Sequence, residues 1–318
     1  MSYRILCAES NTPEWLRARK TILGASEVAC VLGLSRYKSR LGIYLDKLTD
    51  QISDDMSEWQ EWGHRLEDAI AKWVADSQGL TVLPSPGLLQ STEYEWLGAT
   101  PDRVTDKGEP VELKTSDRFM ADDWIDGPPA NYVIQVLVQM IVLGARRGYL
   151  AVLHGGNRPE FHVIEWDQAV VDQIISITGE FWRDNVLAKV APEPVTAAEA
   201  ALAFPNPNDV PIEGGEPLYE AWGAYGLMQA ELKDLEERLD AMKLEFQKAM
   251  GEEATSLTYA DPMAREPLVL FTWKKRKGAT RLDGKQLQAD LPDLYAEYLV
   301  TGNDTRTFLR KTIKEVTR

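Results

Sequence analysis

The sequence predicts a mixed α/β fold, with a central sheet flanked by helices and a smaller C-terminal appendage of helices and strands. Over residues 1–190, capped helical segments alternate with short runs of strand-forming residues bounded by Pro, Gly and Asp. The composition changes near Val190, and the closely spaced prolines that follow are typical of a linker. We therefore predict a domain at residues 1–190, a linker at residues 191–212 and an accessory region at residues 213–318.

Capping signals place the helices of the first domain. Thr12 is followed by proline, a pair that predicts a helix start because Thr caps the free amides and Pro suits the first turn. Ser26 is expected to cap a short second helix. Ser57 opens a capping box, which predicts a long helix ending near Gln78. Glu67 lies in that long helix, beside its apolar stripe.

Composition and charge limit the classes of protein. The net charge of −15 argues against broad, non-specific binding of nucleic acid, because phosphate contacts need Lys and Arg. It does not exclude an enzyme with an acidic metal site and local basic groups. Cys7 and Cys30 are too few for a disulfide scaffold, and no apolar run is long enough to span a bilayer. We expect a cytoplasmic protein without membrane contact.

A short strand-like segment carries the first candidate chemistry. Side chains alternate along a strand, so Glu112 and Lys114 are expected on one face, with Leu113 pointing to the core. By itself this pattern is common on exposed strands. Asp102 lies ten residues upstream, after Pro101, where a turn aspartate is equally common.

Pairing Asp102 with Glu112 on adjacent strands is costly unless a cation lies between them. Hard divalent ions such as Mg²⁺ bind in this all-oxygen environment. Glu67 is a third candidate, provided that its helix crosses the sheet with this side chain turned to the metal. Gln135 and Gln139 follow one turn apart on a later apolar helix, where the polar face of an amphipathic helix is an equally good interpretation.

The order of these motifs resembles the PD-(D/E)xK nuclease superfamily and, more closely, its family of YqaJ-type viral recombinases and lambda exonuclease. The motifs that carry the likeness lie within residues 12–190 and are, in order, Arg19, Gly24-Ala25-Ser26-Glu27, residues 32–39, Gly63-His64-Arg65-Leu66-Glu67, Ala99-Thr100-Pro101-Asp102, Glu112-Leu113-Lys114, and Gln135 with Gln139. No single motif is specific, but their common order is. The resemblance implies a nuclease core with a mixed central sheet flanked by helices.

The resemblance also implies roles for individual residues. The metal ligands would be the carboxylates of Glu67, Asp102 and Glu112, together with the backbone carbonyl of Leu113. Lys114 would orient or activate the attacking water, and Gln135 would support the site. Arg19 and Ser26 match positions that hold the 5′-phosphate of a DNA end. One or two Mg²⁺ or Mn²⁺ ions would position the water, neutralise the phosphoryl oxygens and assist the leaving oxygen.

The implied activity is a DNA exonuclease that digests linear duplex from 5′ to 3′ and leaves 3′ single-stranded tails for phage-type recombination. The implied partners are double-stranded DNA ends, a single-strand annealing protein and two further copies in a ring of three, in a bacterial or phage-infected cell. Two alternatives stay open: a restriction- or repair-type endonuclease on the same core, and a non-catalytic DNA-binding or scaffold protein.

The accessory region has its own pattern. Apolar residues recur at alternating spacings of three and four between Met228 and Phe246. This heptad-like seam predicts either a coiled coil or a helix packed inside the appendage, and its short length favours the packed helix. The basic run Lys274-Lys275-Arg276-Lys277 follows a predicted strand.

Overall fold

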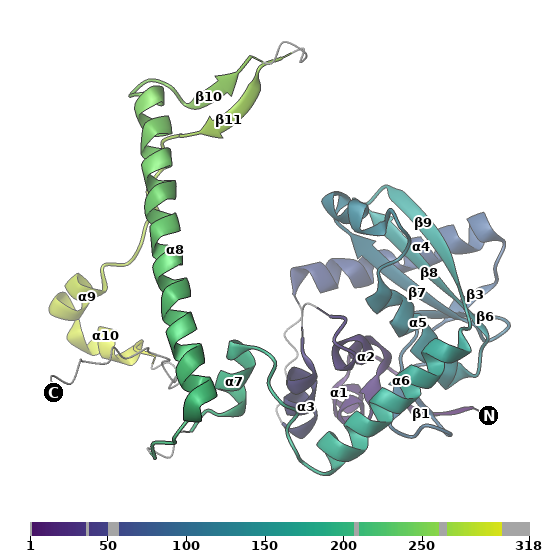
Figure 1. Ribbon diagram of the computed structural model, residues 1–318. Coiled ribbons are helices and arrows are strands. Elements are labelled where there is room, and N and C mark those ends of the chain that lie inside the picture. Colours follow the sequence, from purple (N-terminus) through teal and green to yellow (C-terminus); the bar gives the residue numbers. More distant parts are fainter. Residues whose placement is uncertain (1, 36–37, 50–56, 207–209, 261–265, 301–318) are drawn as a thin grey trace. The chain divides into compact units, whose positions relative to one another are not determined.

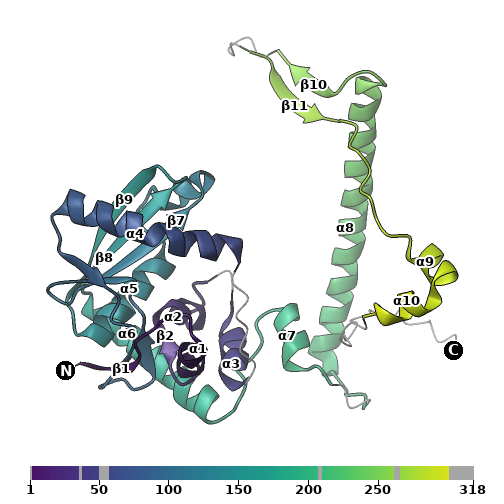
Figure 2. The same cartoon turned by 180° about the vertical axis from the view of Figure 1, so that it is seen from behind.

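The structure is a computed structural model that describes residues 2–35, 38–49, 57–206, 210–260 and 266–300 of the 318-residue chain (Figures 1 and 2). The chain divides into two compact units, Met1–Phe204 and Pro205–Arg318. This division falls inside the predicted linker at residues 191–212. Part of that segment is helical, since α7 (Ala197–Ala203) consists mainly of alanine and Thr196 caps it by accepting a hydrogen bond from the backbone amide of Glu199.

Two sheets organise the first unit. The five-stranded sheet has the order β3-β6-β7-β8-β9, in which β7 and β8 are parallel and the other pairs antiparallel. Its strands are β3 (Val82–Pro84), β6 (Arg103–Thr105), β7 (Pro110–Ser116), β8 (Arg147–His154) and β9 (Arg158–Glu165). The four-stranded sheet has the order β1-β4-β5-β2, formed by β1 (Tyr3–Cys7), β4 (Leu88–Ser91), β5 (Leu97–Ala99) and β2 (Leu23–Gly24). The predicted mixed α/β class is confirmed.

Helices flank these sheets. They are α1 (Pro13–Lys20), α2 (Ala25–Val31), α3 (Arg40–Leu48), α4 (Glu58–Gln78), the 3-10 helix η1 (Arg118–Trp124), α5 (Ala130–Leu143), α6 (Gln168–Glu180) and the π-helix η2 (Phe181–Leu187). Thr12 caps α1 through the backbone amide of Trp15, as the sequence predicts. The prediction that Ser26 caps α2 is wrong. Gly24 holds the cap position, and the carboxylate of Glu27 accepts a hydrogen bond from the Gly24 amide.

The two faces of the five-stranded sheet bury different helices. Leu113 packs in an apolar cluster with Ile70 and Val74 of α4. On the other face, Leu150 and the apolar residues of α5 belong to the larger core. Both views of the ribbon show α4 lying across the strands (Figures 1 and 2). Because side chains alternate along β7, the residues next to Leu113 point toward α5.

The second unit is built on a single long helix, α8 (Gly215–Met250), of 36 residues. A hairpin of β10 (Ser256–Tyr259) and β11 (Leu268–Thr272) follows, and Phe271 stacks on Phe246 with ring centroids 4.4 Å apart. Two short helices, α9 (Gly284–Asp290) and α10 (Pro292–Glu297), come next. None of the helices in the described part of the chain combines the length and the apolar character that a membrane span requires.

Candidate active site

The hairpin of β6 and β7 brings two acidic residues together. Arg103 pairs with Val111 in the antiparallel register, so Asp102, directly before β6, lies next to the start of β7. Its Oδ2 accepts a hydrogen bond of 2.8 Å from the backbone amide of Leu113. The sequence predicted that adjacent strands bring Asp102 and Glu112 together, and the structure confirms this. The strand that does so is β6, because β5 belongs to the other sheet.

Glu112 is 1% exposed and has three side-chain partners. Gln135 and Gln139, one turn apart on α5, donate through Nε2 to its two carboxylate oxygens at 2.6 and 2.5 Å. Lys114 Nζ lies 2.5 Å from Glu112 Oε1. The alternation along β7 thus puts Glu112 and Lys114 on one face, as predicted, and α5 covers that face. The amides and the lysine hold the Glu112 carboxylate in one orientation.

The electrostatics of this cluster are unbalanced. Burial and then the charge of Glu112 hold the pKa of Asp102 well above its ordinary value, although Lys114 and the Leu113 amide act in the opposite sense. Burial lowers the pKa of Lys114, but Glu112 and Asp102 outweigh it and leave that pKa above its ordinary value. Lys114 is therefore a charged donor in this arrangement. Two carboxylates share one cation, an excess of negative charge that favours binding of a further cation.

Glu67 does not join this cluster. Its Oε1 lies 2.7 Å from His64 Nδ1, and its Oε2 lies 3.7 Å from Arg103 Nη1. Within the described ranges, no three His, Cys, Asp or Glu side chains stand close enough together to hold a metal ion. The physical reason is that α4 packs on the Leu113 face of the sheet, whereas Glu112 faces α5. Glu67 still acts at a distance, since its charge adds to the raised pKa of Asp102.

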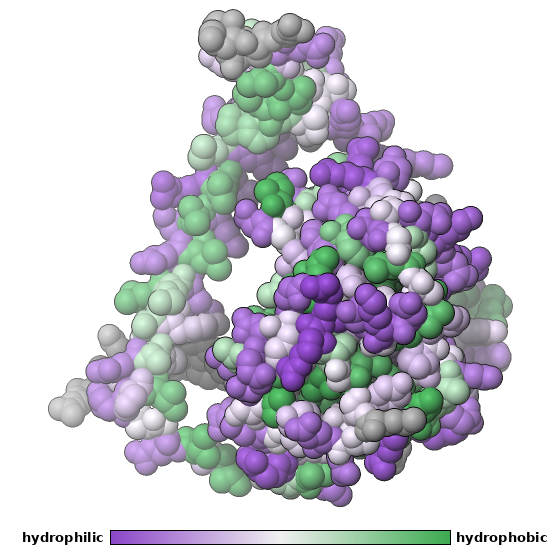
Figure 3. Space-filling model, turned by 90° about the vertical axis from the view of Figure 1, so that its right-hand side faces the viewer, coloured by the Kyte–Doolittle hydropathy of each residue, from purple (hydrophilic) through white to green (hydrophobic). Residues whose placement is uncertain are grey.

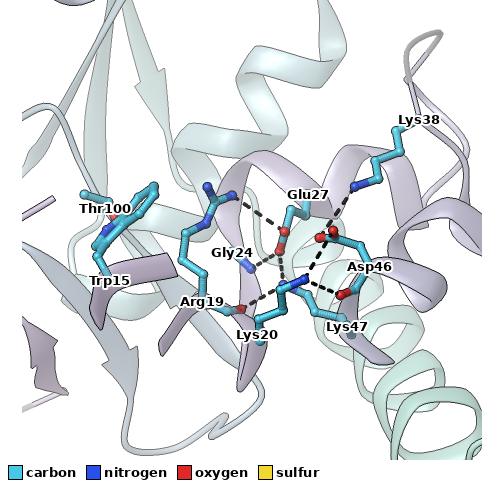
Figure 4. A network of polar contacts seen from close by, with 9 residues as sticks. All are labelled: Trp15, Arg19, Lys20, Gly24, Glu27, Lys38, Asp46, Lys47 and Thr100. Atoms are coloured by element: carbon cyan, nitrogen blue, oxygen red, sulfur yellow. Dashed lines mark hydrogen bonds and ion pairs between the residues drawn. The ribbon is translucent and has the colours of Figure 1, made fainter. Parts of the chain in front are cut away.

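A second network surrounds the buried carboxylate of Glu27 (Figure 4). Its Oε2 accepts hydrogen bonds of 2.7 Å from the Gly24 amide and from Lys47 Nζ. Arg19 Nη2 lies 3.6 Å from its Oε1. The Lys47 side chain is 1% exposed, and burial lowers its pKa even though Glu27 raises it. Here two cations surround one carboxylate, so the negative charge of Glu27 is fully compensated within the chain and the excess charge is positive.

Arg19 is the predicted phosphate ligand, and the structure fixes its position. Its guanidinium stacks 4.6 Å from the centroid of the Trp15 ring. Trp15 Nε1 in turn donates to Thr100 Oγ1 at 3.3 Å, two residues before Asp102 (Figure 4). Ser26 is the second residue of α2, and its side chain is exposed. It lies two positions after Gly24, and the Arg19 guanidinium lies close to Gly24. Residues 36–37 of the third family motif lie outside the described part of the chain.

A cavity of about 570 Å³ opens beside the Lys114 end of β7. Its walls include Thr115 and Ser116, which follow Lys114 on β7, and Asn131 and Tyr132 from the start of α5. Lys114 Nζ lies 5.4 Å from the centroid of the Tyr132 ring. The cavity therefore offers space for a ligand next to the acidic cluster.

Sequence reasoning missed or underweighted several residues of these networks. Gln139 contacts Glu112 as directly as Gln135 does, and its one-turn spacing was the available signal. Tyr132 lies in the first turn of the same helix, but no local pattern relates it to Lys114. Lys47 gave no signal either, because its link to Glu27 depends on the packing of α3 against α2.

Comparison with known proteins finds one domain family and one similar full-length protein. Residues 14–146 match the model of the YqaJ-like viral recombinase domain. A protein of Bacillus subtilis (strain 168) described as "Uncharacterized protein YqaJ" is 29% identical over 299 residues, which cover 91% of each chain. That likeness extends through both units of the structure.

Two solved structures are similar to part of the chain. An alkaline exonuclease from Laribacter hongkongensis has a TM-score of 0.49 at 21% identity, and the match covers 56% of this chain and 94% of that one. A phage related exonuclease from Haemophilus somnus 129PT has a TM-score of 0.41 at 12% identity, covering 53% of this chain and 96% of that one.

Proposed function

We propose that the protein is a metal-dependent DNA exonuclease that digests linear duplex from 5′ to 3′ and leaves 3′ single-stranded tails. The observation that carries the proposal is the pair of the half-buried Asp102 and the buried Glu112, which share one cation, Lys114. A buried excess of negative charge is costly unless the site takes up a cation. The match of residues 14–146 to the YqaJ-like viral recombinase domain supports DNA as the substrate.

One or two Mg²⁺ or Mn²⁺ ions suit this donor set, which is made of oxygen alone. Asp102, Glu112 and the carbonyl of Leu113 would hold the ion. The family resemblance makes Glu67 a candidate for a fourth ligand, and it would have to leave His64 and Arg103 and turn toward Asp102 to reach the ion. The bound ion would neutralise charge on the phosphoryl oxygens and make the attacking water more acidic.

The protein side chains have separate tasks in this proposal. Gln135 and Gln139 keep the Glu112 carboxylate in one orientation, so that the ligand is preorganised. Lys114 carries a positive charge and three N–H donors. It orients the attacking water and donates to a phosphoryl oxygen, where negative charge grows during attack. Its raised pKa opposes a role as the base that accepts the proton.

Arg19 and Ser26 are proposed to bind the 5′-phosphate of the DNA end. A guanidinium can offer two parallel N–H donors to a phosphate, and Trp15 and Glu27 hold this one in place. The Trp15–Thr100 hydrogen bond links this position to the loop that carries Asp102. A single-strand annealing protein and a ring of three subunits complete the proposal as partners.

The decisive experiment uses end-labelled linear duplexes with 5′-phosphate, 5′-hydroxyl and blocked ends, with Mg²⁺ or with a chelator. We expect Mg²⁺-dependent release of nucleotides from the 5′ strand, fastest on the phosphorylated end. The Glu112→Gln variant is the control for contaminating nucleases. Cleavage of closed circular DNA would favour the endonuclease alternative, and the absence of any hydrolysis would favour the scaffold.

A further inference from the structure

The long helix α8 presents an apolar stripe that runs along much of its length. Its members recur at spacings of three and four and are Met228, Leu232, Leu235, Leu239 and Met242. These side chains remain between 49% and 65% exposed. Hydrophobic surface accompanies the helix in the space-filling view (Figure 3). The sequence favoured a packed helix. Among the described residues, the hairpin packs beyond the stripe, where Phe246 stacks on Phe271.

The spacing fits a heptad with Leu232 and Leu239 at position a and Met228, Leu235 and Met242 at position d. Such a stripe is the seam of a coiled coil. The helix has 36 residues, and at about 1.5 Å per residue it extends about 54 Å. That length accommodates several layers of packed side chains. The seam therefore has the geometry to pack against another helix along most of α8.

The charges beside the seam select the partner and its direction. Glu231 and Arg238 occupy the g positions, and Glu236 and Lys243 occupy e positions. In a parallel, in-register pair, g contacts the next e of the other helix, which places Glu231 against Glu236 and Arg238 against Lys243. Both contacts are repulsive. In an antiparallel pair g faces g, so Glu231 meets Arg238 of the second copy, and two-fold symmetry repeats this attraction.

The same antiparallel arrangement also matches the apolar layers. With the two-fold axis between Lys233 and Asp234, Leu232 packs on Leu235 of the second copy, and Met228 packs on Leu239. Each layer then pairs an a residue with a d residue. The stripe is therefore complementary, in both apolar layers and flanking charges, to the same stripe on a second copy of α8 that runs antiparallel to it. We propose that α8 is a homodimerisation helix that forms an antiparallel coiled coil with a second copy of this chain.

The test starts from sedimentation equilibrium of the full-length protein at micromolar concentrations. We expect the double variant Leu232→Ala/Leu235→Ala to have half the mass of the native assembly, whether or not the first unit forms a ring as well. Alanine keeps the helix, because it is the best helix former, and circular dichroism checks this. An unchanged mass in the double variant would overturn the proposal, as would a native protein that is monomeric.

Charge variants test the direction of the two helices. Arg238→Glu should weaken the dimer about tenfold, because it sets two glutamates against each other at two symmetric places. The swap Glu231→Arg/Arg238→Glu should restore the native dissociation constant to within about threefold. Lys233→Glu is the matched control, because it makes the same change of charge at position b, away from the seam. Tighter association of Arg238→Glu would overturn the antiparallel arrangement, since a parallel pair gains from that change.

Discussion

The two buried glutamates, Glu27 and Glu112, occupy different kinds of network. Glu27 contacts Lys47 at 2.7 Å and Arg19 at 3.6 Å and accepts from a backbone amide. Glu112 contacts Lys114 and two neutral amides, and the neighbouring Asp102 adds a second negative charge. In the first network, cations of the chain itself compensate the carboxylate. The second keeps an excess of negative charge, which makes it the better candidate for a metal site.

This contrast shows that a buried carboxylate is not enough to locate chemistry. When a buried carboxylate pairs with cations of the chain, removing the carboxylate leaves those cations without a countercharge. Its substitution should therefore reduce the free energy of unfolding. A carboxylate that lacks charge compensation limits stability in the metal-free protein, and its loss should reduce activity. Substitutions at Glu112, Glu27, Arg19 and Asp102 separate these two cases.

The largest effect is expected at Glu112. Glu112→Gln keeps the shape of the side chain but removes the charge that a cation requires, so hydrolysis should fall by about 10³-fold. The rate of nucleotide release from linear duplex in Mg²⁺ measures it. Near-native circular dichroism should accompany the loss. Activity above a tenth of the native rate would remove Glu112 from the metal site.

The next largest effect concerns stability at Glu27. Glu27→Gln leaves the ammonium of Lys47 buried without its countercharge, and the free energy of unfolding should fall by about 3 kcal/mol. Burial already lowers the pKa of Lys47, so the folded variant loses this proton before the unfolded chain does. Stability lost at neutral pH should therefore return as the pH rises through the folded-state pKa.

Denaturant titration at two pH values measures this prediction. The double variant Glu27→Gln/Lys47→Met is the control, because it removes both charges and should recover most of the loss. If Glu27→Gln alone keeps native stability, the ion pair of Glu27 and Lys47 contributes little to the fold. That result would contradict the structural role given to Glu27.

A smaller effect is expected at Arg19, which belongs to the compensated network but is 30% exposed at its side chain. Arg19→Ala should reduce the preference for 5′-phosphorylated over 5′-hydroxyl ends by about tenfold, the scale of one charge-assisted hydrogen bond. The ratio of the two initial rates measures it. Arg19→Lys keeps the charge without the bidentate fork and should give an intermediate ratio. An unchanged ratio in Arg19→Ala would assign this arginine to the fold alone.

The smallest effect is a gain in stability. Burial and Glu112 raise the pKa of Asp102, so the folded protein holds this proton more tightly than the unfolded chain. Native stability therefore falls as the pH rises from the ordinary range of Asp through the folded-state pKa. Asp102→Asn should be more stable than the native protein by about 1 kcal/mol at pH 8 in a chelator, with no advantage at pH 4.

Thermal unfolding with and without Mg²⁺ measures this gain. Added Mg²⁺ should stabilise the native protein more than the variant and thereby reverse their order, because only the native site binds the ion tightly. The same order of stability in both conditions would contradict a cation at Asp102.

Local patterns in the sequence determined much of the site. Thr12 and Ser57 marked the starts of α1 and α4, because a cap depends on a few neighbouring residues. The placement of Glu112 and Lys114 on one face followed from the alternation of a strand. Asp102 was expected beside Glu112, and the short connection between β6 and β7 explains why that expectation was correct.

Only the tertiary structure decided which elements meet. A helical period predicts that Glu67 lies beside an apolar stripe, but not that α4 covers the Leu113 face and leaves Glu112 to α5. The sequence predicted Ser26 as the cap of α2, but Gly24 holds that position. The Glu27 carboxylate accepts a hydrogen bond from the Gly24 amide and another from Lys47 of α3. Capping and alternation depend on neighbours along the chain. The choice of packed face and the partners of a buried charge depend on contacts between distant segments, which no local pattern records.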